Sequence, residues 1–384
     1  MTITTLKGIL NRKFAGANID EVVGVSDYSL FGEAASYFLS EVNPSETTRL
    51  GTLEVFQDVY DYDPADDLKE LVDTRPQGST RASSDNLTRR YSEEFDQGKH
   101  NNNDDFALEW RDGTKVLRYA KSTSGGNIGV HDMDSLTGNG TWSGTAANIA
   151  LSTYNPYKGS GSISADYDTG EYIENTGLTA VDLSDHENKS NLFLSAYFPD
   201  ASLVTNVALR WGSSSTVYFS RTATAPQFGS FRNGWNLIPF PWNGATETGT
   251  VDTDNIDYLR ITYTGSSDTD IKFDNVFSAL GTVRDILYYS NYLFRSSAGT
   301  WLAIPTADSD IINLDIDSEN LFVYECIRLI ALQLQGKGDI YTSYTNELYG
   351  TGQKPGMYDR YKKRKPDEAI YAQNRWRRMG YKKK

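Results

Sequence analysis

The sequence predicts an α+β protein of several domains, in which an antiparallel β-sandwich is inserted between N-terminal and C-terminal helical segments. Its 384 residues are sufficient for two or three domains. Apolar residues recur at helical spacing only near the two ends, whereas the middle holds short alternating runs separated by turn residues. With 25 Tyr, 16 Phe, 7 Trp and 32 Gly, the composition favours turn-rich β structure over a coiled coil.

The charge and the cysteine count exclude several classes of protein. There are 51 acidic and 37 basic residues, and the net charge of −14 excludes a uniformly basic nucleic-acid-binding protein. Cys326 is the single cysteine and there are three histidines, so neither a disulfide framework nor a zinc site is expected. Because no signal-peptide pattern and no apolar run of roughly 18 residues is present, we expect a soluble protein, made in a cytoplasm, with no membrane partner.

Residues 1–73 are predicted to form the N-terminal helical segment. Leu6 and Leu10 share one helical face, and a second apolar face runs through residues 30–39. Asn43-Pro44 and Asp63-Pro64 each match the start of a helix, with a capping residue followed by proline at the first helical position. Two further helices are therefore expected, with apolar stripes in residues 50–59 and 68–72.

Residues 74–105 are polar and have no hydrophobic period, which indicates either a linker or arm that orders on a partner or a mobile surface loop.

Residues 106–283 are predicted to be β. Their short alternating runs, at spacings of about ten residues, are typical of a sandwich. The predicted strands are 115–120, 192–198, 204–211, 216–221, 235–240, 259–263 and 271–277.

Residues 284–350 are predicted to contain the C-terminal helices, and residues 351–384 a basic arm. Val323, Ile327 and Ile330 lie on one face of a helix that Asp317 or Ser318 can cap. A shorter helix is expected from Asp339 to Gly350. The tail from Gln353 onward carries 7 Lys and 5 Arg against 2 Asp and 1 Glu, a net charge of +9, so the remainder carries −23.

Three groups of residues are candidates for binding, and none of them forms a catalytic motif, so no enzymatic activity is expected. The tail interleaves cations with aromatic rings, which suits docking on a partner protein, contact with DNA, or a solvated terminus. Trp211, Tyr218, Trp235 and Trp242 could stack on sugar rings or fill the core. Carboxylates near the first and last strands could hold a structural calcium or only stabilise turns. The tail residues are Arg375, Trp376, Arg377, Arg378 and Tyr381, and the carboxylates are Asp132, Asp134 and Asp274.

Five short motifs between His131 and Leu280 carry a first resemblance. They are Gly140-Thr141-Trp142, Gly159 to Ser164, Gly234 to Pro239, Ile256 to Ile261, and Phe273 to Val276. In order and spacing they resemble the β-jelly-roll of carbohydrate-binding modules. The resemblance implies a jelly-roll and a structural calcium held by Asp274 together with Asp132 or Asp134. No run of exposed aromatic residues is evident, so sugar binding does not carry over with the fold.

The flanking regions carry a second resemblance. The apolar segment Leu321 to Gln335, the break at Gly336-Lys337-Gly338, the Tyr-rich segment Ile340 to Tyr349 and the extended tail are similar to a head-to-tail connector (neck or adaptor) protein of tailed bacteriophages. This resemblance implies a structural virion protein located in the neck. Residues 1–73 and 284–350 would form a homo-oligomeric ring between the portal and the next neck or tail protein.

The two resemblances lead to two main hypotheses of different class. The first is a non-enzymatic phage neck adaptor whose jelly-roll projects outward and whose basic arm docks on a partner. The second is a glycan-binding component of a tail fibre or of a cell surface, with the jelly-roll as the part that contacts a host glycan. A carbohydrate-active enzyme is a third hypothesis.

Overall fold

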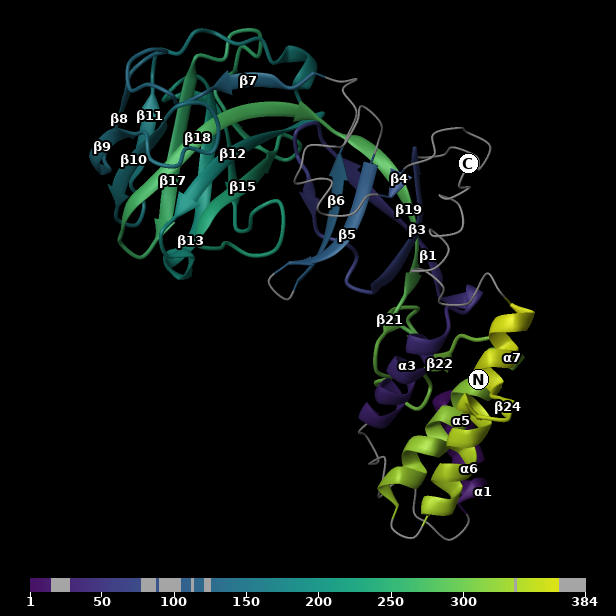
Figure 1. Cartoon of the computed structure of the whole chain (residues 1–384). Coiled ribbons are helices and arrows are strands. Elements are labelled where there is room, and N and C mark those ends of the chain that lie inside the picture. The colour runs from purple at the N-terminus through teal and green to yellow at the C-terminus, as the bar shows by residue number, and fades with distance from the viewer. Residues whose placement is uncertain are drawn as a thin grey trace, which may run out of the picture. The chain divides into compact units, whose positions relative to one another are not determined.

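The computed structural model describes residues 1–14, 28–76, 88–89, 105–111, 114–120, 126–334 and 337–365. The chain divides into two compact units (Figure 1). The helical unit comprises Met1–Gly51, Ala65–Thr74 and Ile286–Lys384, and the sandwich unit comprises Thr52–Pro64 and Arg75–Asp285. The chain therefore passes between the units four times, after Gly51, Pro64, Thr74 and Asp285. The predicted tail residues Arg375, Trp376, Arg377, Arg378 and Tyr381 lie outside the described residues.

Helices from both ends of the chain share one hydrophobic core in the helical unit. Phe38 packs edge-on against Phe322, with ring centroids 5.9 Å apart, and both side chains are fully buried. Burying these apolar faces against one another stabilises helices that would be marginal alone. None of the helices in the described ranges is both long and apolar enough to cross a membrane. The helices are α1 (Ile3–Lys13), α3 (Ser29–Glu41), α5 (Ile316–Gln333), α6 (Gly338–Tyr349) and α7 (Met357–Arg364).

The ends of the C-terminal helices follow local capping chemistry. Helix α5 begins two or three residues earlier than predicted, because Asp315 rather than Asp317 or Ser318 is its cap. The Asp315 carboxylate accepts a hydrogen bond from the Ser318 N–H group at 2.8 Å. Helix α6 ends at Gly350, which has a φ of 85°, a conformation that glycine adopts without a steric penalty. The predicted end of this helix is confirmed.

The two additional N-terminal helices predicted from Asn43-Pro44 and Asp63-Pro64 are strands. Strand β1 (Thr48–Val55) and strand β3 (Leu68–Pro76) pair on either side of β19 (Thr282–Ser290). In β1 the burial alternates, with Thr52 and Glu54 exposed and Val55 buried. The apolar spacing fits both periods, and pairing with a strand from a distant part of the sequence outweighs the local preference for a helix.

The sandwich is built from two six-stranded antiparallel sheets whose inner faces meet in one core (Figure 1). Leu192, Leu194, Ala196 and Phe198 on β12 are fully buried, which confirms the predicted inner face. The first sheet has the order β15 (Gly234–Pro241), β12 (Ser190–Phe198), β18 (Asp268–Leu280), β10 (Ser162–Tyr167) and β9 (Ala147–Ser152), with β7 (Ile128–His131) also pairing with β18. The second has the order β16 (Thr246–Thr248), β14 (Val217–Ala223), β13 (Val204–Ser214), β17 (Tyr258–Gly265), β11 (Tyr172–Asn175) and β8 (Trp142–Gly144).

A smaller sheet belongs to the sandwich unit but lies outside the two layers. It has the order β2 (Asp61–Tyr62), β6 (Thr114–Ala120), β5 (Asp105–Arg111) and β4 (Thr88–Arg89). The strand predicted at 115–120 is therefore present, but it pairs here rather than in the sandwich. Asp61 and Arg118 of this sheet, with Asp58 and Tyr60 just before β2, line the pocket described below.

Short strands complete the helical unit. A three-stranded sheet has the order β21 (Trp301–Leu302), β20 (Phe294–Arg295) and β22 (Ile311–Ile312). Strands β23 (Gly350–Thr351) and β24 (Lys354–Pro355) form a hairpin between α6 and α7. Phe294 and Ile312 are buried in the helical core, so the small sheet contributes to the same hydrophobic cluster as the helices.

Candidate functional site

An aromatic pocket of the sandwich unit lies against the outer face of the first sheet and has a volume of about 270 Å³. In β15 the side chains of Ile238 and Phe240 point into the core, so Trp235 and Leu237, at the alternate positions, point away from it. Asn236 of β15 also lines the pocket, and the remaining lining comes from the loop before β15, from Tyr157, from the segment that leads into β2, and from the small sheet. Those residues are Pro226, Gln227, Phe228 and Arg232, and Asp58, Tyr60, Asp61 and Arg118.

Trp235 is the central aromatic residue of this pocket. Its ring contacts Tyr157 at a centroid distance of 5.7 Å and Tyr197 at 5.6 Å, and Tyr197 is its partner across the β12–β15 pair. The indole Nε1–H group donates a hydrogen bond to the Asn155 carbonyl oxygen at 3.0 Å. Because neighbouring rings and this hydrogen bond hold the indole, its orientation is fixed before any ligand arrives.

Balanced charges surround the aromatic rings. The guanidinium group of Arg118 lies 3.1 Å from the Asp61 carboxylate and 3.4 Å from that of Glu109. Arg232 is exposed at the rim. Burial raises the pKa of Tyr157, and burial together with the charge of Asp58 raises the pKa of Tyr60. Both phenols are therefore neutral hydrogen-bonding groups at physiological pH.

Hydrogen bonds hold the walls of the pocket in place. The Asp63 carboxylate accepts from the Gly229 N–H group at 3.0 and 3.2 Å, which ties the loop before β15 to residues 52–64. Asn236 braces the same loop, because its side chain accepts from Arg232 N–H at 3.0 Å and donates to the Arg232 carbonyl at 2.8 Å. A ligand therefore meets an ordered surface, which reduces the entropy lost on binding.

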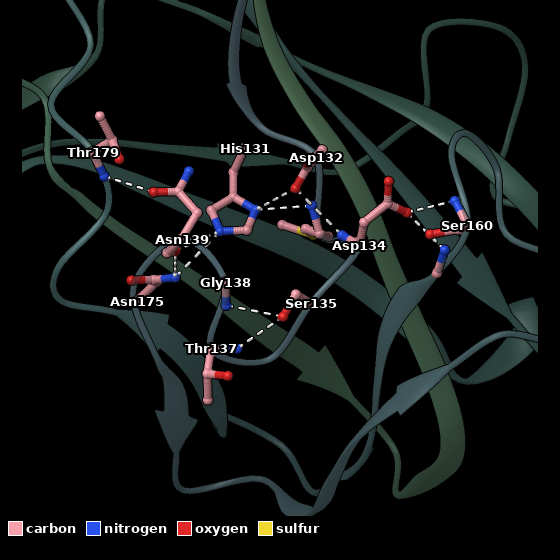
Figure 2. Close-up of polar contacts among 12 residues, drawn as sticks. His131, Asp132, Asp134, Ser135, Thr137, Gly138, Asn139, Ser160, Asn175 and Thr179 are labelled. Atoms are coloured by element: carbon pink, nitrogen blue, oxygen red, sulfur yellow. Dashed lines mark hydrogen bonds and ion pairs between the residues drawn. The ribbon is translucent and has the colours of Figure 1, made fainter.

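Two carboxylates hold the loop that carries Tyr157. Asp274 on β18 accepts hydrogen bonds from the N–H groups of Tyr157 and Lys158 at 2.8 and 2.9 Å. Asp134 accepts from the N–H groups of Ser160 and Gly161 at 2.6 and 2.7 Å, and Figure 2 shows its carboxylate turned toward Ser160. The two acidic side chains thus fix both ends of a short loop beside the pocket.

Asp274 is electrostatically unfavourable in this position. Burial, together with the nearby charge of Asp134, raises the pKa of Asp274 to about 6, although backbone hydrogen bonds oppose the shift. Its Oδ1 atom is buried and has no hydrogen-bond partner among the described residues. A buried lone pair beside a second carboxylate is the environment that a hard cation such as calcium would neutralise.

The predicted calcium ligands are only partly brought together. Asp134 and Asp274 are close enough to interact electrostatically, and their oxygens suit calcium. The Asp132 side chain is 72 % exposed, lies 3.7 Å from His131, and accepts a hydrogen bond from Asp134 N–H at 3.4 Å, as in a turn (Figure 2). Within the described ranges no three His, Cys, Asp or Glu side chains cluster in a way that could hold a metal. Asp134 and Asp274 would be the side-chain ligands, and calcium binding stays a prediction.

Replacing Asp274 with asparagine should distinguish a calcium site from a metal-free turn. The pKa of Asp274 in the folded protein, about 6, lies above the ordinary value of 3.8. The protonated carboxyl group therefore contributes to the stability of the folded state below pH 4, and this contribution is lost as the pH rises through 6. With a chelator present at pH 7, the free energy of unfolding of Asp274→Asn should therefore be no lower than that of the wild type, and up to roughly 1–3 kcal/mol higher. Urea unfolding at pH 4.5 and 7 measures this difference, which should shrink at the lower pH.

Added calcium provides the complementary measurement. It should raise the unfolding free energy of the wild type, since a ligand that binds only the folded state stabilises it, and should leave Asp274→Asn unchanged. If calcium leaves the wild type unchanged as well, the two carboxylates act only as hydrogen-bond acceptors for the loop.

The structure contradicts one predicted glycan contact and leaves another open. Trp211 is fully buried in the sandwich core, stacked on Phe219 at 5.9 Å and edge-on to Trp242 at 5.5 Å. It cannot present a ring to a sugar, so the predicted role of Trp211 is wrong. Tyr218 is half-buried on the second sheet, with the Arg210 guanidinium group 4.4 Å from its ring centroid, and it does not line the pocket. Its glycan contact stays a prediction.

Several pocket residues were not identified from the sequence. Tyr157 lies in a turn-rich run, and Tyr60 lies within a segment predicted to be a helix. Arg118 comes from a strand assigned to the sandwich. The alternation in β15 does contain a usable signal, because it places Trp235 on the face opposite Ile238 and Phe240.

No protein-family model matches this sequence, and a search of curated proteins finds no match. The chain is similar to solved carbohydrate-binding modules. A family 11 module from Clostridium thermocellum, in complex with a beta-1,3-1,4-mixed-linked tetrasaccharide, is 15 % identical, with 42 % of this chain and 98 % of that chain covered and a TM-score of 0.30. A family 30 module of a Clostridium thermocellum cellulosomal cellulase is 11 % identical, covering 41 % and 96 %, with a TM-score of 0.27. A family 22 xylan-binding domain is 18 % identical, covering 41 % and 96 %, with a TM-score of 0.25. Similarity at this level says nothing of what this chain binds.

Proposed function

We propose that the sandwich unit binds a glycan in the pocket around Trp235. The observation that carries the proposal is an indole fixed between Tyr157 and Tyr197 and bordered by paired charges. The faces of sugar rings are apolar and stack on aromatic side chains, while their hydroxyl groups need polar partners around the rim. Both kinds of surface are present in this pocket.

The polar residues suit a ligand that is rich in hydroxyl groups and has no net charge. Asp58 and Asp61 are matched in number by Arg118 and Arg232 among the lining residues. Carboxylates accept from sugar hydroxyls, and guanidinium groups donate to them in a planar fork. Because the charges balance, we expect binding to depend only weakly on salt.

Calorimetric titration of the full-length protein with neutral oligosaccharides tests this proposal. We expect saturable binding that changes little between low and high salt. The full chain is needed, because residues 52–64 supply part of the lining. No binding across a broad panel of neutral and acidic glycans would contradict the proposal.

We propose binding without hydrolysis. Among the described lining residues the two carboxylates are already engaged, since Asp61 pairs with Arg118 at 3.1 Å and Asp58 accepts a hydrogen bond from the Asn127 side chain at 2.8 Å. A glycosidase needs one carboxylic acid to protonate the leaving group and a second carboxylate across the scissile bond. Prolonged incubation with each bound oligosaccharide should release no shorter product.

The second candidate function is that of a virion neck adaptor, as the sequence of the helical segments suggests. The observation that favours it is a single helical unit built from both chain ends, with Ile316 and Leu332 exposed by 77 % and 60 %. Exposed apolar side chains of this kind can be buried against a neighbouring copy of the chain when subunits assemble into a ring. The portal and the neighbouring neck protein would be the partners, with the basic tail as the docking arm.

The mass of the purified assembly tests the adaptor proposal. A closed ring of many copies would support it. Because Tyr358 and Tyr361 of α7 are buried in the helical core, the deletion that tests the docking arm must spare α7. Deletion of residues 366–384 should leave a folded chain that no longer assembles with its portal. A monomer or a trimer at high concentration would contradict the ring, and a trimer would favour a fibre component.

A further inference from the structure

Asn275 lies at a β-bulge in strand β18. Its neighbours Asp274 and Val276 pair with two successive residues of β12, so Asn275 itself has no partner across this strand pair. Its φ of 47° falls in the left-handed region, which asparagine tolerates better than most residues that carry a side chain. Phe273 and Val276 both belong to the sandwich core. The bulge therefore turns the Asn275 side chain, which simple alternation would bury beside Phe273, to the outer face of the sheet.

The Asn275 carboxamide has no hydrogen-bond partner among the described residues, although the residue is only 8 % exposed. Buried polar side chains normally have such a partner. The adjacent Asp274 shows the usual case, because its carboxylate accepts from two backbone N–H groups. The polar atoms of Asn275 are not enclosed by protein, in contrast to Asp274 Oδ1. They form part of the small exposed area of the residue, so the carboxamide is available to a ligand.

Asn275 lines two cavities on this side of the sandwich. The larger has a volume of about 670 Å³ and the smaller about 480 Å³. The larger cavity is also lined by Asp58, Tyr60 and Tyr157, and these three residues line the Trp235 pocket as well. The Trp235 pocket and the larger cavity therefore adjoin. A ligand that extends from Trp235 past Tyr157 enters the cavity that Asn275 lines.

The larger cavity has ordered walls of two kinds. Asn127 Nδ2 donates hydrogen bonds to the Gln57 carbonyl oxygen at 3.0 Å and to the Asp58 carboxylate at 2.8 Å, which holds the segment before β2 in place. Phe277 supplies an apolar wall, and its ring is stacked on that of Phe193 at a centroid distance of 5.2 Å. Polar groups beside an apolar surface suit a sugar unit here, as in the neighbouring pocket.

We propose that the bound glycan continues from the Trp235 pocket into this cavity, where the Asn275 carboxamide binds two hydroxyl groups of a further sugar unit. The inference rests on the proposed function and narrows its ligand from sugars in general to oligosaccharides. A carboxamide carries N–H donors and a carbonyl acceptor side by side, so it can accept from one hydroxyl and donate to the next. In the competing role, asparagine is present only because it tolerates the bulge, and its carboxamide binds water.

Calorimetric titration of the full-length protein with ligands of increasing length separates these roles. The probes are neutral cello-, xylo- and manno-oligosaccharides, each taken from the monosaccharide to the hexasaccharide. We expect the wild type to bind the longer members of one series at least about tenfold more tightly than the monosaccharide, since each further hydrogen bond and each buried apolar contact adds to the affinity. Equal affinity for the monosaccharide and the hexasaccharide would overturn the inference.

Asn275→Gly is the decisive variant. Glycine adopts a φ of 47° without a steric penalty, so the variant should keep the bulge and melt close to the wild type. It should bind the monosaccharide as the wild type does and lose about tenfold in affinity for the longer oligosaccharides. Asn188→Gly is the matched control, because Asn188 also has a positive φ, 55°, but is exposed and lines neither cavity. It should bind every probe as the wild type does.

The outcomes distinguish this inference from the proposed function. If Trp235→Ala loses the oligosaccharides but Asn275→Gly keeps wild-type affinity for them, the glycan site stands and its extension to Asn275 is overturned. If Asn275→Gly also loses the monosaccharide, Asn275 supports the Trp235 pocket itself, and the extension is again overturned. If the wild type binds no glycan at all, the proposed function fails and the extension fails with it.

Discussion

Replacing Trp211 with alanine should lower the free energy of unfolding of the sandwich by about 3–5 kcal/mol. The indole is fully buried between Phe219 and Trp242, and its removal leaves a cavity that a packed core fills only in part. Urea unfolding followed by fluorescence or circular dichroism measures the loss. At a temperature where the variant is folded, its glycan affinity should equal that of the wild type, since Trp211 does not line the pocket.

Trp211→Phe is the matched variant. The Trp211 Nε1–H group is buried and has no hydrogen-bond partner in the part of the chain that the structure describes. Phenylalanine therefore removes an unsatisfied donor and keeps an aromatic ring. We expect a smaller loss of stability than with alanine. A stable Trp211→Ala protein that has lost glycan binding would reverse the assignment and place the indole at the ligand.

Replacing Trp235 with alanine should weaken glycan binding by about thirtyfold or more, since truncating a central aromatic anchor commonly costs about 2 kcal/mol or more. The variant loses the ring on which the sugar would stack, as well as the contacts that order Tyr157 and Tyr197. Calorimetry with the tightest-binding oligosaccharide gives the affinity, and the melting temperature shows whether the fold is retained.

Two further variants show what that loss means. Trp235→Phe keeps a ring but loses the hydrogen bond to Asn155, and it should bind with intermediate affinity. Trp110→Ala is the control, because Trp110 is 71 % exposed on β5 and lies outside the pocket. Equal binding by Trp235→Ala and the wild type would exclude this pocket as the glycan site.

The sandwich strands could be predicted because their signal is local. In β12 and β17 every second residue is apolar, and the side chains that this pattern places inside are buried. The segments around β1 and β3 could not be assigned in the same way, because their apolar residues fit a helix and a strand equally well. Their pairing with β19, a strand far along the sequence, decides the outcome.

The pocket could be predicted only in part for a similar reason. Trp211 and Trp235 are equivalent as residue types, and only their place in the alternation of each strand separates a core ring from a pocket ring. Further lining comes from Asp58, Tyr60, Asp61 and Arg118, which lie outside the sandwich sheets. No local pattern indicates that these segments meet, since their contacts are formed by tertiary packing.

The four passages of the chain between the two units have a mechanical consequence. An inserted domain with one entry and one exit transmits a pulling force through two covalent links, whereas here the links after Gly51, Pro64, Thr74 and Asp285 share the load. A force applied through a bound glycan would then reach the helical unit through several covalent links at once. Each link would carry only part of the force, so no single segment would be pulled out alone.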